Sequence, residues 1–242
     1  MGACVFCLSS ASLSDHQILL RGRTMYLCAP RGQMVEGFLA VAPYECVGAL
    51  SLLPPESFRE LERFANVIES FYTEAFGCSS WLSYEQGRGG GGALADAEAG
   101  FPFHAHLCAV PMSVDLHQPL AARFTPREIS SLRELRSIPR RTPYLYIDGP
   151  DRHARRRKVV YLPSTVEMSG ELERSRLKPL IAELGGIPHR GHWRGYADDA
   201  ELAAVTARFA GWQGSAPEGA SERSEASHAN GASRRSGSGE SG

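Results

Sequence analysis

Short apolar runs rich in strand-forming residues recur through the first half of the chain. Four of them, at 17–20, 24–29, 37–43 and 79–85, are each bounded by glycine, proline or polar turn residues, which is typical of strands. A fifth run, around 104–109, alternates polar and apolar side chains with the two-residue period of a strand. The pattern therefore predicts a twisted antiparallel sheet of about five strands.

The segment between the third and fourth runs has the periodicity of a helix. Residues 57–76 place apolar side chains three or four positions apart, which predicts an amphipathic helix packed on the sheet. Ser57 and Glu60 have the spacing of a capping box at its start, and Gly77 is suited to its end. The predicted buried face consists of Phe58, Leu61, Phe64, Ile68, Phe71 and Ala75.

The second half of the chain predicts a smaller set of elements. Residues 142–163 predict two strands around a basic turn, and 175–184 and 198–209 predict helices. The glycine-rich segment 88–103 predicts a mobile loop. Residues 213–242 contain no aromatic or branched aliphatic side chain, so they predict a disordered tail. The fold class is α+β.

Composition narrows the class of protein. With 43% hydrophobic and 22% charged residues, the 242-residue chain resembles ordinary globular proteins, and no run of about 18 apolar residues suggests a membrane span. The N-terminal MGACVFCLSS has no basic segment before an apolar one, so we expect no secretory signal and a cytoplasmic protein. The net charge of −1 gives no global attraction for nucleic acid, so a phosphate ligand must be bound by local groups.

The candidate chemistry is concentrated in HAHLC, residues 104–108. Alternation along a strand places His104, His106 and Cys108 on one face, with apolar neighbours on the other. Imidazole acts near neutral pH as a metal ligand or a nucleophile. The alternative is a half-solvated strand face. At the N-terminus, Cys4 and Cys7 form a C-x-x-C, which is half of a tetrahedral zinc site or, alternatively, two buried thiols.

Several segments together resemble the histidine triad (HIT) superfamily. CVFC, GFLAVAPYECVGAL, the capped helix, SYEQG and HAHLCAVP follow its order, and the family's active strand reads H-φ-H-φ-H or H-φ-H-φ-Q. CLSS, RTMYLCAPRGQMVEGFLAVAP and YEQG look most like CwfJ-type HIT-like proteins. The resemblance covers residues 4–112 and implies a HIT-like fold with a zinc knuckle.

The resemblance also implies roles for individual residues. Zinc-carrying members bind the metal through the C-x-x-C, a histidine shortly after the strand that ends in proline, and the first triad histidine. This chain has Cys46 at the position of the second of these ligands, and a thiolate can replace imidazole in a zinc site. Here these are Cys4, Cys7, Cys46 and His104, which predicts structural Zn²⁺ in a Cys3His site; Cys46 alone is otherwise a small buried residue. The middle histidine, His106, is then the nucleophile.

Three departures from the family pattern affect the predicted site. Cys108 occupies the third triad position, where a thiol is a weak hydrogen-bond donor. Glu85 and Gln86 replace the usual Asn-Glu, and we expect them to contact the substrate. The family's usual Gly-Gln-Ser/Thr phosphate loop is replaced by the longer segment 88–103. Within it, Arg88 is the residue best able to hold a phosphate; the alternative is a solvated loop arginine.

The resemblance predicts an enzyme, a HIT-type nucleotide hydrolase or nucleotidyltransferase. It would act at the α-phosphate of a nucleotide or nucleotide conjugate through a covalent nucleotidyl-His106 intermediate, with Cys108 as the second catalytic residue. The alternative is a non-catalytic or weakly catalytic nucleotide- or RNA-binding adaptor related to RNA-processing CwfJ-type proteins, with RNA the less favoured partner. No membrane partner is expected.

The predicted domains are a HIT-like catalytic core at 1–112, a C-terminal extension of hairpin and helices at 113–212 packed on it, and the tail at 213–242. Compact HIT proteins are often homodimers, and the extension could replace the partner surface. The basic run at 152–158 could contact polyphosphate or RNA, or be a solvated hairpin tip. A polar aromatic cluster, His189, His192, Trp193 and Arg194, could close the far side of the pocket, or Trp193 could be a core residue with polar neighbours.

Overall fold

The computed structural model describes residues 6–8, 13–88, 104–174, 177–192 and 198–212. The predicted tail at 213–242 and residues 89–103 of the predicted loop lie outside the described residues. In chain order, with η for 3-10 helices, the elements are η2 (Asp15–Gln17), β1 (Ile18–Arg21), β2 (Met25–Cys28), β3 (Leu39–Pro43), η3 (Leu50–Leu52), α1 (Pro55–Phe76), β4 (Leu82–Gly87), β5 (Leu107–Val110), α2 (His117–Ala121), β6 (Thr125–Glu128), η5 (Leu132–Ser137), β7 (Tyr144–Pro150), β8 (Arg156–Leu162), α3 (Val166–Arg174), α4 (Leu177–Leu184), η6 (Pro188–Arg190) and α5 (Asp199–Gly211).

The strands form one open antiparallel sheet of eight members in the order β1-β2-β3-β5-β4-β7-β8-β6. The prediction of about five strands is therefore wrong. The C-terminal hairpin does not stand apart, because β7 pairs with β4 and continues the same sheet past residue 112. The edge strand β6 escaped prediction because its sequence, TPRE, carries no alternation of apolar residues.

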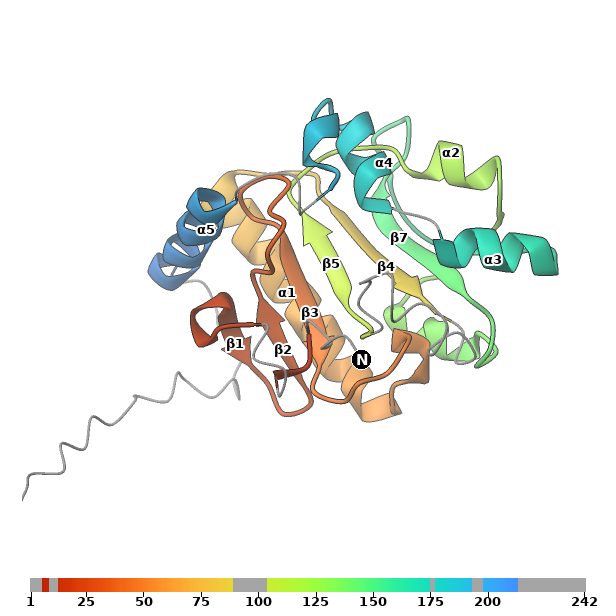
Figure 1. Cartoon of the computed structure of the whole chain (residues 1–242), viewed down its shortest axis with the longest axis horizontal. Coiled ribbons are helices and arrows are strands. Elements are labelled where there is room, and N and C mark those ends of the chain that lie inside the picture. Colours follow the sequence, from red (N-terminus) through yellow and green to blue (C-terminus); the bar gives the residue numbers. More distant parts are fainter. Residues whose placement is uncertain (1–5, 9–12, 89–103, 175–176, 193–197, 213–242) are drawn as a thin grey trace, which may run out of the picture.

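Helix α1 lies along one face of the sheet, behind β2, β3 and β5 in Figure 1. Its predicted end is confirmed, since Gly77 takes the left-handed conformation, with φ 60° and ψ 24°. The predicted capping box is wrong. Pro54 precedes the first turn, and the Glu60 carboxylate instead accepts hydrogen bonds from the backbone N–H groups of Arg23, at 2.6 Å, and Thr24, at 2.7 Å.

The two faces of the sheet carry separate apolar cores. On the α1 face, Leu107 and Ala109 pack with the buried face of α1 and with α5. On the other face, Cys108 and Val110 pack with residues of α3 and α4, which Figure 1 shows over the β4–β7 side of the sheet. The predicted alternation is therefore confirmed for Leu107, Cys108 and Ala109. The strand is shorter than predicted, because β5 begins at Leu107 and His104 and His106 lie just before it.

The hairpin β7–β8 and the helices α4 and α5 confirm the predicted elements of the second half. Helices α2 and α3 were not predicted; α2 has only 5 residues, and Gly170 interrupts the apolar pattern of α3. Among the described helices, none has the length and apolar character needed to cross a membrane.

Candidate functional site

Three of the four predicted metal ligands lie together. The ligand atoms of Cys7, Cys46 and His104 are all within 4.8 Å of one another. They come from the N-terminal arm, the loop after β3 and the residues just before β5, which are far apart in sequence. Cys4, the fourth predicted ligand, lies outside the described residues.

The hydrogen bonds of His104 orient its ring for metal binding. Its Nε2 lies 2.6 Å from the carbonyl oxygen of Pro43, which can only accept, so Nε2 carries the proton and donates. Nδ1 then has a lone pair, and it lies 3.5 Å from the Cys7 Sγ. A backbone carbonyl that fixes the tautomer in this way is typical of metal-binding histidines. The buried imidazole and two thiols fit a tetrahedral zinc or similar ion.

Backbone hydrogen bonds position the loop that contains Cys46 beside His104. The loop that follows β3 crosses the ends of two strands, where the N–H of Ala105 donates to the carbonyl of Val47 at 2.7 Å. The N–H of Arg88 donates to the carbonyl of Gly48 at 3.1 Å. The loop is thereby fixed between the end of β4 and the start of β5, with the Cys46 thiol beside His104.

His106 is half-buried next to this cluster. Its Nδ1–H donates to the carbonyl oxygen of His104 at 2.7 Å, which leaves the lone pair of the neutral ring on Nε2. The ring of Phe6 stacks on it, with centroids 4.3 Å apart and an interplanar angle of 24°. Burial lowers the pKa of His106 to about 4. The ring is thus held by contacts on both its edge and its face.

Cys108 lies inside the second core rather than on an open surface. It is 3% exposed and packs with Phe38, Leu82 and Tyr84. Burial raises the pKa of its thiol to about 12, so the group stays protonated at neutral pH. A buried thiol in the third triad position is a poor hydrogen-bond donor to a phosphate.

The residues expected to contact substrate fall on two faces of β4. Glu85 lies on the α1 face and is 1% exposed; its carboxylate accepts hydrogen bonds from the Leu50 N–H at 2.6 Å and the Tyr144 hydroxyl at 2.7 Å. Gln86 lies on the face of the sheet opposite α1, which is called the His106 face below; its Nε2 donates to the carbonyl of Leu172 in α3 at 3.1 Å. Arg88 is half-buried at the end of the strand. Burial raises the pKa of Glu85 to about 7.

A lysine that sequence reasoning missed lies on the His106 face of the sheet. Lys178 of α4 donates a hydrogen bond to the carbonyl of Gly32, and its ammonium lies 4.5 Å from the centroid of the Phe38 ring. Burial lowers the pKa of Lys178 to about 8. A single lysine on an amphipathic helix carries no signal in the sequence, because only the tertiary fold places it near this face.

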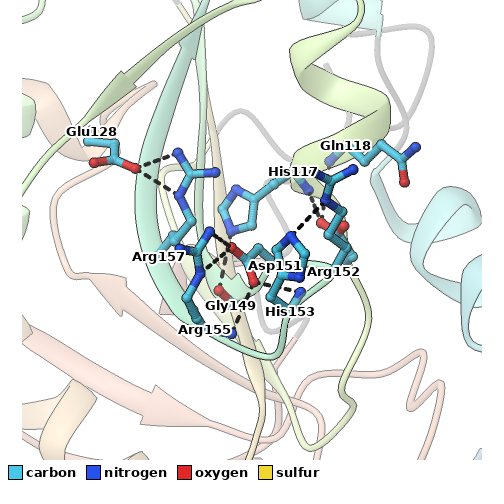
Figure 2. A network of polar contacts seen from close by, with 10 residues as sticks. His117, Gln118, Glu128, Gly149, Asp151, Arg152, His153, Arg155 and Arg157 are labelled. Carbon is cyan, nitrogen blue, oxygen red and sulfur yellow. Dashed lines mark hydrogen bonds and ion pairs between the residues drawn. The ribbon is translucent and has the colours of Figure 1, made fainter.

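The basic run at 152–158 covers the β7–β8 turn and the start of β8, and three of its arginines are paired. Figure 2 shows two of these pairs, those of Arg155 with Asp151 and of Arg157 with Glu128. Arg155 lies 2.7 Å from an Asp151 oxygen, Arg156 lies 2.7 Å from Asp148, and the Arg157 Nε lies 2.7 Å from Glu128. The Arg155 guanidinium holds the pKa of the Asp151 carboxyl well below its usual range. Carboxylates of the protein itself thus neutralise much of the predicted basic surface.

The polar aromatic cluster predicted near the C-terminus lies partly outside the described residues, because Trp193 and Arg194 are not among them. His189 and His192 are exposed. Neither alternative for this cluster is tested by the described residues, because Trp193 is not among them.

Comparisons with known proteins match the N-terminal part of the chain. The family described as "Protein similar to CwfJ C-terminal" matches residues 1–87. The match includes the C-x-x-C, Cys46 and Glu85 and ends before His104. A relative from Arabidopsis thaliana, "Zinc finger CCCH domain-containing protein 64", is 36% identical over 69 residues, which are 28% of this chain and 12% of that protein. The chain therefore spans only a small part of that relative.

Proposed function

We propose that the chain is a zinc-stabilised protein of HIT-like fold that binds a nucleotide or RNA on the His106 face and takes part in RNA processing. The similarity to the CwfJ C-terminal family supports the RNA-processing role. The single structural observation that carries binding rather than catalysis is the enclosure of Cys108, because a buried thiol is poorly placed to assist a leaving group. Such a role suits the nucleus as well as the predicted cytoplasm.

The proposed metal is structural zinc. The Cys7 and Cys46 thiolates and the Nδ1 of His104 would hold it, with Cys4 as the fourth ligand. Zinc supplies a cross-link between three distant segments without any redox chemistry. A relative named for a zinc finger is consistent with this choice of metal. In this proposal the ion fixes the arm that carries Phe6 against His106.

A second candidate function is nucleotidyl transfer by His106. The hydrogen bond from Nδ1 to His104 favours it, because the lone pair on Nε2 is then the one available for attack. Nε2 would form a bond to the α-phosphorus while the bond to the leaving oxygen breaks. A water or phosphate oxygen would then attack the phosphorus and release the imidazole.

One experiment separates the two functions. The purified protein is incubated with α-labelled ATP and with a labelled dinucleoside polyphosphate, and AMP affinity is measured by calorimetry. Binding without an acid-labile, base-stable adduct supports the adaptor, and an adduct that His106→Ala removes supports the enzyme. We expect His106→Ala to weaken AMP binding at least about fivefold, or about 1 kcal/mol. His189→Ala, at an exposed histidine of η6, is the matched control. If AMP does not bind and no adduct forms with either labelled nucleotide, nucleotide binding and nucleotidyl transfer are both wrong.

A further inference from the structure

A cleft lies at the N-terminal end of α1, on the α1 side of the sheet and away from the His106 face. Its cavity volume is about 390 Å³. One wall is the first turns of α1 and the other is η5, which packs on α1 through the buried Leu132 and Leu135. The residues that line it are Pro55, Glu56, Arg59, Arg133 and Arg136.

The lining of this cleft is strongly cationic, with three guanidinium groups and one carboxylate. Arg133 is held in place by Glu62 of α1, with N···O distances of 3.0 and 3.2 Å. Arg59 and Arg136 are exposed, and neither makes an ion pair or side-chain hydrogen bond within the described part of the chain. Their donors are therefore open to a ligand, and the positive end of α1 adds to the same field.

This arrangement differs from that of the basic run at 152–158, which covers the β7–β8 turn and the start of β8. There, Arg155, Arg156 and Arg157 each face a carboxylate of the protein. Arginines that the fold already neutralises attract an external anion weakly, whereas unpaired ones attract it strongly. The favoured anion-binding surface is thus the cleft, although the basic residues are denser along the sequence at 152–158.

Positive charge continues beyond the cleft along the chain. Arg140 and Arg141 follow Arg136 on an exposed segment. Residues 132–142 contain one acidic residue, Glu134, and its carboxylate is turned back to accept hydrogen bonds from Ser130 and Ser131. A row of cations along a surface suits a polyanion better than a single small anion.

We propose that this cleft binds backbone phosphates of a single-stranded nucleic acid. Guanidinium groups bind phosphate oxygens through paired N–H donors, and a flexible single strand can follow the row of arginines from the cleft to Arg141. Glu56, on the same wall, opposes the phosphates and limits affinity. The inference goes beyond the proposed function, because it concerns a second site that does not use His106.

Fluorescence anisotropy with labelled U12 and the full chain tests this proposal, from 50 to 200 mM salt. The Arg59→Gln/Arg136→Gln variant should bind about tenfold more weakly at low salt. Its slope of log affinity against log salt should be smaller by about 1.4, because each lost phosphate contact removes about 0.7. Arg31→Gln/Arg152→Gln removes the same charge from exposed arginines elsewhere and should change affinity less than about threefold. Glu56→Gln should tighten binding two- to threefold, which misfolding would not do.

Each of the following four results would contradict the proposed single-strand site. Equal effects of the two double variants would mean that only net charge matters. Displacement of U12 by micromolar pyrophosphate would indicate a small-anion site, and equal displacement by a twelve-residue polyglutamate would indicate a surface for acidic proteins. Loss of U12 binding in His106→Ala but not in Arg59→Gln/Arg136→Gln would place the strand on the His106 face. That result would contradict the cleft and leave the proposed function standing.

Discussion

The ring of Phe6 stacks on His106 at a centroid distance of 4.3 Å. Phe6 directly precedes Cys7 of the ligand cluster, and its carbonyl accepts a hydrogen bond from the Tyr26 hydroxyl on β2. The arm that supplies the proposed metal ligands therefore also covers one face of the candidate functional imidazole. In the proposed function, loss of the metal would change the environment of His106 through this aromatic contact and through the hydrogen bond of His106 to the His104 carbonyl.

Removal of the metal should uncover His106. Cys7→Ser should lose the ion and lower the free energy of unfolding by about 3 kcal/mol, which is a fall in Tm of about 6–12 °C for a chain of this size. Modification of His106 by diethyl pyrocarbonate, followed by mass spectrometry, should become at least about fivefold faster. The matched control is Cys78→Ser, at a half-buried thiol that donates to the Ser80 carbonyl instead. Equal stability and reactivity in both variants would break the proposed link.

Glu85 should make stability depend on pH. Its pKa is raised from 4.5 to about 7 by burial, so between these values the folded protein keeps a proton that the unfolded chain releases. The free energy of unfolding therefore falls as pH rises through this window, by about 3 kcal/mol from this group alone. Glu85→Gln keeps an acceptor for the Leu50 N–H but cannot ionise.

Urea denaturation between pH 4.5 and 8 measures this effect. Relative to the wild type, Glu85→Gln should gain about 3 kcal/mol from the acid end of this range to the alkaline end. Parallel stability profiles for the two proteins would show that Glu85 does not titrate in this range and that the buried carboxylate is stabilised by other means.

Cys108 should be replaceable by an apolar residue. Valine has a similar volume and suits the apolar contacts with Phe38 and Tyr84, so Cys108→Val should cost less than about 1.5 kcal/mol of stability. If the thiol plays no chemical part, AMP affinity and any turnover should stay within twofold of the wild type. A loss of more than tenfold in either would restore Cys108 as a functional member of the triad.

The sequence predicted those parts of the fold whose signals are local. The period of α1, the end of that helix at Gly77 and the alternation around β5 all depend on neighbouring residues. The capping box failed because Glu60 finds a partner 36 or 37 residues away, in the turn between β1 and β2. No local pattern encodes such a choice between two sets of backbone donors.

In the candidate site, too, local signals were predictable from the sequence and contacts between distant segments were not. Cys46 was found only because a family resemblance marked its position, while the contacts of Phe6 with His106 and of Lys178 with Phe38 join distant segments. The basic run at 152–158 was visible in the sequence, but its pairing with Asp148, Asp151 and Glu128 depends on the strand register. Charge density in a sequence therefore did not reveal which arginines lack partners.

X-ray absorption at the zinc edge, combined with elemental analysis of the purified protein, tests the central claim most directly. The account predicts one zinc per chain with three sulfur ligands at about 2.3 Å and one nitrogen at about 2.0 Å, and loss of the nitrogen in His104→Ala. A folded protein with no bound transition metal, or a metal shell that is unchanged in His104→Ala, would contradict it.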